Sequence, residues 1–143
     1  VIAITDAVLP GMRSRKWGRI ITSTSAGVVA PIANLGISNT LRAALHGWSK
    51  TLAREVAAEG VTSNIIVPGL IATDRITFLA TERAKREGIS IEAVAAANTA
   101  QIPLGRLGDP AEYGAVAAFL ASVPAAYVTG TVVRVDGGLI ASV

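Results

Sequence analysis

Short apolar runs alternate along this chain with longer segments in which apolar residues recur every three or four positions. Residues 18–24 (GRIITST) and 61–69 (VTSNIIVPG) are short and rich in β-branched side chains, which is typical of buried strands. Residues 129–138 (TGTVVRVDGG) have the same character and run into a double-glycine turn. The pattern therefore predicts three strands.

Two helices are predicted with clear boundaries. Residues 37–57 carry apolar side chains at spacings of three and four, which form one broad apolar face. Residues 108–122 begin with Asp109 as N-cap, Pro110 at the first helical position and Glu112 at the third, a strong start signal. The apolar residues of the first helix are Leu41, Ala44, Leu45, Trp48, Leu52 and Val56.

The remaining segments are less regular. Residues 2–12 indicate the tail of a helix that closes near Pro10, and residues 25–36 form a loop of small residues. Gly60 is placed as the C-cap of the helix before it. Residues 73–105 have mixed polarity, with helical stretches in which the charged residues are expected to form a solvated face: Glu82, Arg83, Lys85, Arg86 and Glu87.

Strands separated by helices imply parallel β-α-β units with right-handed crossovers. We therefore expect an α/β fold, specifically half of a doubly wound parallel sheet, in a single partial domain over residues 1–143. The composition agrees with a partial domain, because the chain is 51% hydrophobic, has a mean hydropathy of +0.52 and is only 16% charged. Such an excess of apolar residues suggests a large oligomer interface or a missing piece of the same fold.

Several functional classes are disfavoured by the composition. The net charge is +3, and the basic residues within 13–19 are placed in a solvated turn, so no nucleic-acid partner is expected. The chain has no cysteine and a single histidine, His46, which argues against a metal site. Residues 113–133 are uncharged but interrupted by glycine and proline, so no membrane span or membrane partner is expected. The sequence shows no signal-peptide pattern.

Four linked motifs resemble the C-terminal half of the short-chain dehydrogenase/reductase family, and within it the 3-oxoacyl-acyl-carrier-protein reductase branch. "GRIITSTSAG" resembles the strand that bears the catalytic serine. "AALHGWSKTLAREVAAEGVTSNIIVPGLIATD" resembles the active-site helix, the next strand and the Pro-Gly cofactor loop. "IPLGRLGDPAEYGAVAAFLAS" and "AAYVTGTVVRVDGG" resemble the last helix and strand. The resemblance covers essentially the whole chain.

The resemblance implies a Rossmann-like, cytoplasmic oxidoreductase that uses NAD or NADP on a small carbonyl or alcohol substrate. It implies a substrate lid at residues 73–105. Because missing strands would leave an apolar sheet edge uncovered, we also expect a homo-oligomer contact through the helix region 37–58. Its cofactor loop corresponds here to Pro68, Gly69, Ile71 and Thr73.

The dinucleotide fingerprint of that family lies in its N-terminal half. This chain contains neither G-x-G-x-x-G nor G-x-x-x-G-x-G. We therefore expect that half to be absent and the chain alone to bind dinucleotide weakly and to be inactive. The choice between NADH and NADPH is not encoded in these residues.

The active-site positions depart from the family pattern. The family places a tyrosine 13 residues after its serine and a lysine four residues later; counting from Ser25, these positions hold Ser38 and Arg42. The flanking sequence "AALHGWSKTLA" fixes this register. The two tyrosines, Tyr113 and Tyr127, lie downstream, where the resemblance predicts packing roles.

The altered pair changes the expected chemistry. A serine hydroxyl is a far weaker acid than a phenol, and arginine stays protonated, so neither relays protons as tyrosine and lysine do. Ser38 and Arg42 share one helix face and, with Ser25, are expected to bind an anion or a carbonyl. Loss of the proton donor costs roughly 10²–10⁴ in rate, which leaves slow reduction with water as the proton source.

Three other interpretations stay open. In the first, Ser38 is only a helix-start residue and Arg42 is a surface cation. In the second, the site is non-reductive, as in the halohydrin dehalogenases of this fold, which keep serine and tyrosine but use arginine in place of lysine. In the third, the chain is a non-catalytic homologue that serves as a binding or structural subunit. His46 is expected to be solvated in all of them.

Overall fold

The computed structural model describes residues 1–142, and its centre is a parallel sheet. The strands are β1 (Gly18–Ser23), β2 (Val61–Pro68) and β3 (Val132–Val135), in the order β1-β2-β3. Gly18 pairs with Val61 and Ile65 pairs with Val132, both in parallel register. The prediction of three parallel strands separated by helices is confirmed.

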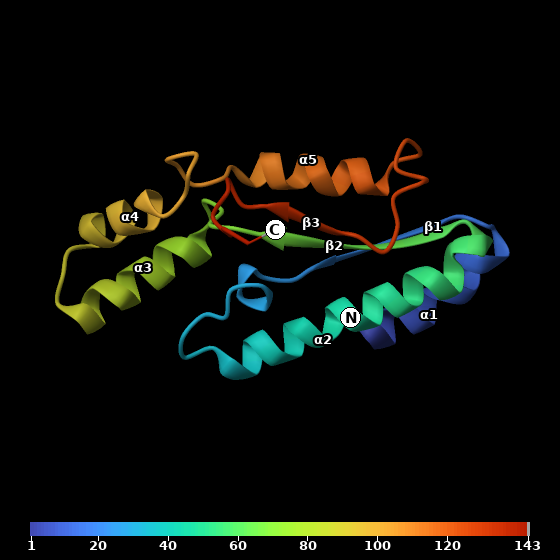
Figure 1. Ribbon diagram of the computed structural model, residues 1–143, viewed down its shortest axis with the longest axis horizontal. Coiled ribbons are helices and arrows are strands. Elements are labelled where there is room, and N and C mark those ends of the chain that lie inside the picture. Colours follow the sequence, from blue (N-terminus) through green and yellow to red (C-terminus); the bar gives the residue numbers. More distant parts are fainter. Residues whose placement is uncertain (143) are drawn as a thin grey trace.

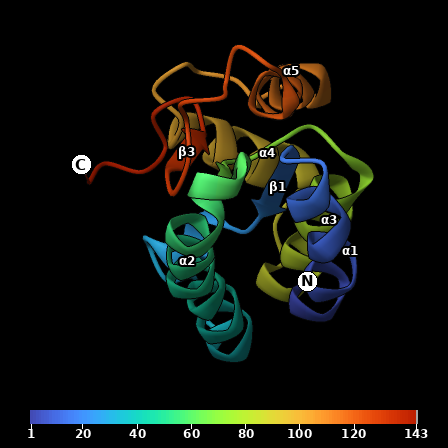
Figure 2. The same cartoon turned by 90° about the vertical axis from the view of Figure 1, so that its right-hand side faces the viewer.

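The helices cover both faces of this sheet and extend beyond one end of it. Figure 1 and Figure 2 show α1 and α2 on one face and α5 on the other. The pair α3 and α4 projects past the end of the sheet at which β2 and β3 finish (Figure 1). The helix bounds are α1 Ile2–Ser14, α2 Gly36–Val56, α3 Asp74–Glu87, α4 Ile91–Ala100 and α5 Pro110–Ala121, with short 3-10 turns at Ala26–Val28 and Ala57–Glu59.

The core lies around β2, in which Val61 through Val67 are all buried. A first cluster joins this strand to β1 and α2 through Ile20, Leu52 and Val56, with Trp48 packed against it. Burial of each such aliphatic side chain contributes roughly 1.5–3 kcal/mol. The periodic apolar face of α2 therefore anchors the helix along the sheet.

The sequence predicted that the first helix ends near Pro10. In the structure α1 continues through Pro10 to Ser14. Leu9 and Met12, on either side of the proline, pack against the first core cluster. Met12 also fills the space beside Gly18, where an added Cβ would come within 2.6 Å of its sulfur. Tertiary packing of the last turn thus outweighs the loss of one helical hydrogen bond at Pro10.

The predicted helix boundaries elsewhere are confirmed. The Asp109 carboxylate accepts from Ala111 N at 2.7 Å, and the Glu112 carboxylate accepts from Asp109 N at 2.8 Å, so both halves of a capping box are present. Gly60 has φ 74° and ends the turn that follows α2. Among residues 1–142, no helix has the length and hydropathy needed to cross a bilayer.

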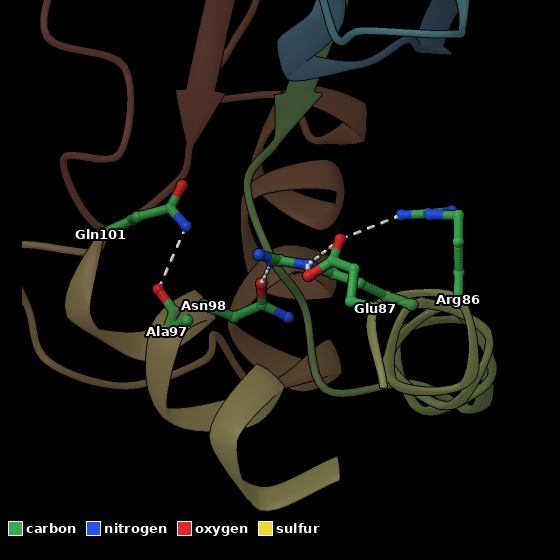
Figure 3. Close-up of polar contacts among 6 residues, drawn as sticks. Arg86, Glu87, Ala97, Asn98 and Gln101 are labelled. Carbon is green, nitrogen blue, oxygen red and sulfur yellow. Dashed lines mark hydrogen bonds and ion pairs between the residues drawn. The ribbon is translucent and has the colours of Figure 1, made fainter. Parts of the chain in front are cut away.

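Helices α3 and α4 form a hairpin with a small apolar seam at Ala80, Ala84 and Val94. Glu82, Lys85, Arg86 and Glu87 are exposed, as predicted, whereas Arg83 is half-buried between the two helices. Figure 3 shows the contacts around Glu87 and Asn98. Glu87 pairs with Arg86 at 3.3 Å and with Arg83 at 3.0 Å. Arg83 also reaches the Asn98 side chain of α4 at 3.5 Å, which ties the two helices together. The hairpin is held mainly by its own seam and surface pairs.

Candidate functional site

The candidate site lies where the parallel strands β1 and β2 end. In open α/β sheets, ligands bind outside the carboxyl ends of the strands. Strand β1 ends at Ser23, two residues before Ser25, and β2 ends at Pro68, at the start of the proposed cofactor loop. All the candidate residues identified from the sequence follow these two strands or lie on α2.

Ser25 begins the short 3-10 turn that follows β1. Its half-buried side chain accepts a hydrogen bond from Gly27 N at 3.1 Å, so the hydroxyl oxygen is an acceptor there. A serine hydroxyl has one proton to donate and two lone pairs. The O–H of Ser25 therefore stays free to donate to another group.

Ser38 and Arg42 are in direct contact on α2, as their four-residue spacing predicts. Arg42 Nε donates to Ser38 Oγ at 3.3 Å, and Arg42 Nη1 donates to the main-chain oxygen of Thr24 at 2.8 Å. Ser38 is half-buried and Arg42 is exposed. The second bond brings the guanidinium to the residue immediately before Ser25, so one cation connects the two serine-bearing segments.

An open groove runs along the start of α2. Arg42 is the charged side chain that lines it, and Ser23, Asn34 and Ser38 are the polar ones; Ser25 is not among its lining residues. Its walls are otherwise mainly apolar. The lining residues are Val1, Ser23, Asn34, Leu35, Gly36, Ile37, Ser38, Leu41, Arg42 and Leu45.

The proposed cofactor loop leaves the sheet at Pro68. Gly69 N donates to Val135 O at 2.9 Å, and an added Cβ at Gly69 would come within 2.6 Å of Asp136 Cα, so only glycine fits this close approach. Ile71 forms a bridge to Gly108. The loop is therefore tied to the end of β3 and to the segment just before α5.

The exposed end of this loop is Thr73, which precedes α3. Its hydroxyl donates to Ile71 O at 3.3 Å. The loop thus presents a hydroxyl and main-chain groups beside the α3–α4 hairpin. A second cavity adjoins it, lined by Leu70, Ile71, Leu104, Arg106, Gly108, Glu112, Val135, Asp136 and Gly137.

His46 is half-buried and hydrogen-bonded to Thr24, rather than fully solvated as the sequence predicts. Its Nε2 lies 3.0 Å from Thr24 Oγ1, the ring is half-buried, and burial lowers the pKa of the imidazole below 6.5. His46 lies away from the apolar stripe of α2, which is why its sequence position indicates solvation. Positions Ser38, Arg42 and His46 form a second stripe, at spacings of four, that faces the end of β1.

The tyrosines do not fill the position of the missing phenol. Tyr113 Oη lies 2.6 Å from Ser23 Oγ, and Tyr113 comes from α5, on the other face of the sheet from α2 (Figure 2). Tyr127 is fully exposed in this chain, so the expected packing role is wrong for this residue. Within residues 1–142, neither phenol has a hydrogen bond to Ser25, Ser38 or Arg42.

Comparison with known proteins gives consistent matches over the whole chain. The sequence profile of a family described as enoyl-(acyl carrier protein) reductase matches residues 1–140. The 3-oxoacyl-[acyl-carrier-protein] reductase FabG of Escherichia coli is 42% identical over 141 residues, which are 97% of this chain and 52% of that protein. FabG of Pseudomonas aeruginosa is 43% identical over 138 residues, covering 95% of this chain and 51% of the relative. The chain thus spans about half the length of these curated relatives.

Solved structures match equally well. YwfH, described as an NADPH-dependent reductase involved in bacilysin biosynthesis, superposes with a TM-score of 0.90 at 32% identity, covering 99% of this chain and 56% of that one. L-Sorbose reductase from Gluconobacter frateurii, solved with NADPH and L-sorbose, gives a TM-score of 0.91 at 34% identity, covering 99% and 54%.

Proposed function

Because this chain belongs to the short-chain dehydrogenase/reductase family, we propose that it forms the nicotinamide and substrate side of an NAD(P)(H)-dependent oxidoreductase. The reaction is the interconversion of a small carbonyl compound and its alcohol at an atypical Ser25, Ser38 and Arg42 centre. The α3–α4 hairpin serves as the substrate lid. The expectation of a cytoplasmic location stays a prediction.

One observation carries this proposal: both serine hydroxyls accept hydrogen bonds from N–H groups. Ser25 accepts from Gly27 N, and Ser38 accepts from Arg42 Nε. Each hydroxyl therefore keeps its own proton for donation to a substrate oxygen. Two O–H donors and a permanent cation suit an oxygen atom that gains negative charge.

The residues at this edge of the sheet fit the nicotinamide end of the cofactor. The 69–73 loop offers neutral main-chain groups and the Thr73 hydroxyl, which suit a carboxamide and a phosphate or ribose oxygen. Arg42 adds a cation at the carboxyl end of the neighbouring strand β1. When bound, the reduced nicotinamide supplies a hydride to the carbonyl carbon.

The chain's own residues handle the oxygen. As the carbon–hydrogen bond forms, the C=O π bond breaks and its electron pair moves to the oxygen, which Arg42, Ser25 and Ser38 stabilise. Water supplies the proton that completes the alcohol, because arginine does not give up its proton at accessible pH. The carbonyl compound would thereby be reduced at the expense of the bound nicotinamide, and alcohol oxidation would be the reverse.

A non-catalytic role is the second candidate. It is favoured by the contacts of Arg42, whose Nε and Nη1 are both engaged within the protein, as expected of a cation with a structural role. The wide apolar surface at the start of α2, which includes Ile37 and Leu41, also suits a subunit contact. In that case the cofactor binds and no turnover follows.

The deciding experiment supplies the full-length protein with NADH or NADPH and a panel of 3-oxoacyl and other carbonyl substrates. We expect slow turnover that falls by about 10²-fold or more in Arg42→Ala, since one oxyanion-stabilising group is lost. Arg54→Ala, at the far end of α2, is the matched control and should keep the wild-type rate.

Tight cofactor binding without turnover, persisting in a Ser38→Tyr/Arg42→Lys double variant, would reject the enzyme and support the binding subunit. Equal rates in wild type and Arg42→Ala would show that Arg42 is a surface cation only.

A further inference from the structure

A polar stripe on α2 meets Thr24, the residue that follows β1. Ser38, Arg42 and His46 follow one another at spacings of four, so they lie along one side of the helix. Arg42 and His46 both hydrogen-bond to Thr24, and Ser38 hydrogen-bonds to Arg42. The polar stripe of the helix is therefore organised around the end of β1.

Thr24 is fixed at three points. Its N–H donates to Ile66 O at 3.0 Å, which extends the β1–β2 pairing by one residue. Its carbonyl oxygen accepts from Arg42 at 2.8 Å, and its hydroxyl lies 3.0 Å from His46 Nε2. The residue is only 3% exposed. A buried polar group held in this way has little freedom to move.

We infer that Thr24 and His46 are positioning residues for the Arg42 guanidinium. The imidazole holds the Thr24 side chain against α2, and this keeps the Thr24 carbonyl where Arg42 Nη1 meets it. Arg42 is thereby held between Ser38 and the strand end. Its other N–H groups make no hydrogen bond within residues 1–142 and are left for a substrate oxygen. This inference rests on the proposed function of Arg42.

The neighbouring threonine shows that the Thr24 contact is specific. Thr22 lies two residues earlier on the same side of β1 and is 4% exposed, yet its Oγ1 is buried with no hydrogen-bond partner in the part of the chain that the structure describes. A buried hydroxyl on this side of the strand does not always find a hydrogen-bond partner, so the bond between Thr24 and His46 is a specific feature. Thr22→Val is the natural control for Thr24→Val, because both remove one buried hydroxyl while conserving shape.

The test follows the Arg42 Nε–H signal by NMR of the 15N-labelled protein, with the signal assigned by its loss in Arg42→Ala. We expect Thr24→Val and His46→Leu each to shift or broaden this signal, and Thr22→Val to leave it unchanged. Thr24→Ser and His46→Gln, which keep a hydrogen-bonding group at each position, should restore it.

Turnover provides the second readout. Thr24→Val and His46→Leu should lower kcat about tenfold with KM changed less than about twofold, because a displaced guanidinium weakens stabilisation of the transition state. Thr22→Val should match the wild type.

The two readouts separate the inference from the proposed function. An Arg42 signal that is unchanged in both Thr24→Val and His46→Leu overturns the inference, whatever the rates. Equal perturbation by Thr22→Val also overturns it, because the effect would then be general to the strand. A specific shift in a protein with no turnover supports the positioning role and rejects the enzyme.

Discussion

Arg42 Nη1 lies 2.8 Å from the main-chain oxygen of Thr24, the residue immediately before Ser25. This bond joins helix α2 to the carboxyl end of β1. It also explains how a chain with serine and arginine at the tyrosine and lysine positions keeps an ordered site: the cation is held by the backbone as well as by Ser38. The arrangement suits charge stabilisation rather than proton transfer.

Gly69→Ala should distort the cofactor loop. The added methyl would come within 2.6 Å of Asp136 Cα, which is backbone and has little room to give, so we expect destabilisation of about 1–3 kcal/mol. Gly114→Ala is the matched control, because it lies within α5 with no atom within 4 Å of the added Cβ. It should be stabilising by up to about 1 kcal/mol. Urea unfolding of both variants checks this, and equal effects would contradict the close approach.

Glu112 should make stability depend on acid pH. Bonds from Arg106 and from Asp109 N lower the pKa of its carboxyl to about 2 in the folded protein, against 4.5 for the free group. The unfolded chain therefore binds more protons between these values, and this contribution is present above pH 4.5 and lost as the pH falls towards 2.

The Glu112→Gln variant tests this by denaturant unfolding across the same range. The difference in unfolding free energy between wild type and variant should shrink on acidification. A difference that stays constant with pH would contradict the assigned pairing with Arg106.

His46, like Glu112, should make the folded protein less stable as the pH falls, but in a higher pH range. Burial lowers the pKa of the folded imidazole below 6.5, so the unfolded chain binds the proton more readily and stability falls as the pH drops below 6.5. His46→Gln should lack this component. Since the chain has a single histidine, its ring Hε1 resonance reports the pKa directly. A titration midpoint above 6.5 would show that the ring is not desolvated as described.

The exposed apolar start of α2 should mediate self-association. Ile37 is 81% exposed and Leu41 is 65% exposed. Both lie on α2, the helix through which the sequence predicts a homo-oligomer contact, and exposed apolar patches of this kind favour association. Leu41→Glu should reduce the molar mass measured by light scattering. Val123→Glu, at a 72% exposed residue after α5, is the control and should not. A monodisperse monomer in the wild type would contradict this prediction.

The sequence predicted the parts of this site that depend on local spacing. Periodicity placed Ser38 and Arg42 on one face of α2, and the strand pattern placed Ser25 directly after β1. Both features are set by neighbouring residues along the chain.

Contacts between distant segments were not accessible in the same way. The His46–Thr24 bond joins residues 22 positions apart and depends on how α2 lies along the sheet. The continuation of α1 through Pro10 likewise depends on burial of Leu9 and Met12 in the core. The spacing of four residues between Arg42 and His46 was the one sequence signal for the His46 contact, because it places the imidazole on the same side of α2 as the guanidinium.

The most direct test of the altered centre is the pH dependence of kcat between about pH 7 and 9.5, in the full-length wild type and in Ser38→Tyr/Arg42→Lys. A centre without a titrating proton donor predicts a flat wild-type profile, whereas the double variant gains a sigmoidal step. A step in the wild type that disappears in Tyr113→Phe would contradict the account, because a phenol would then be supplying the proton.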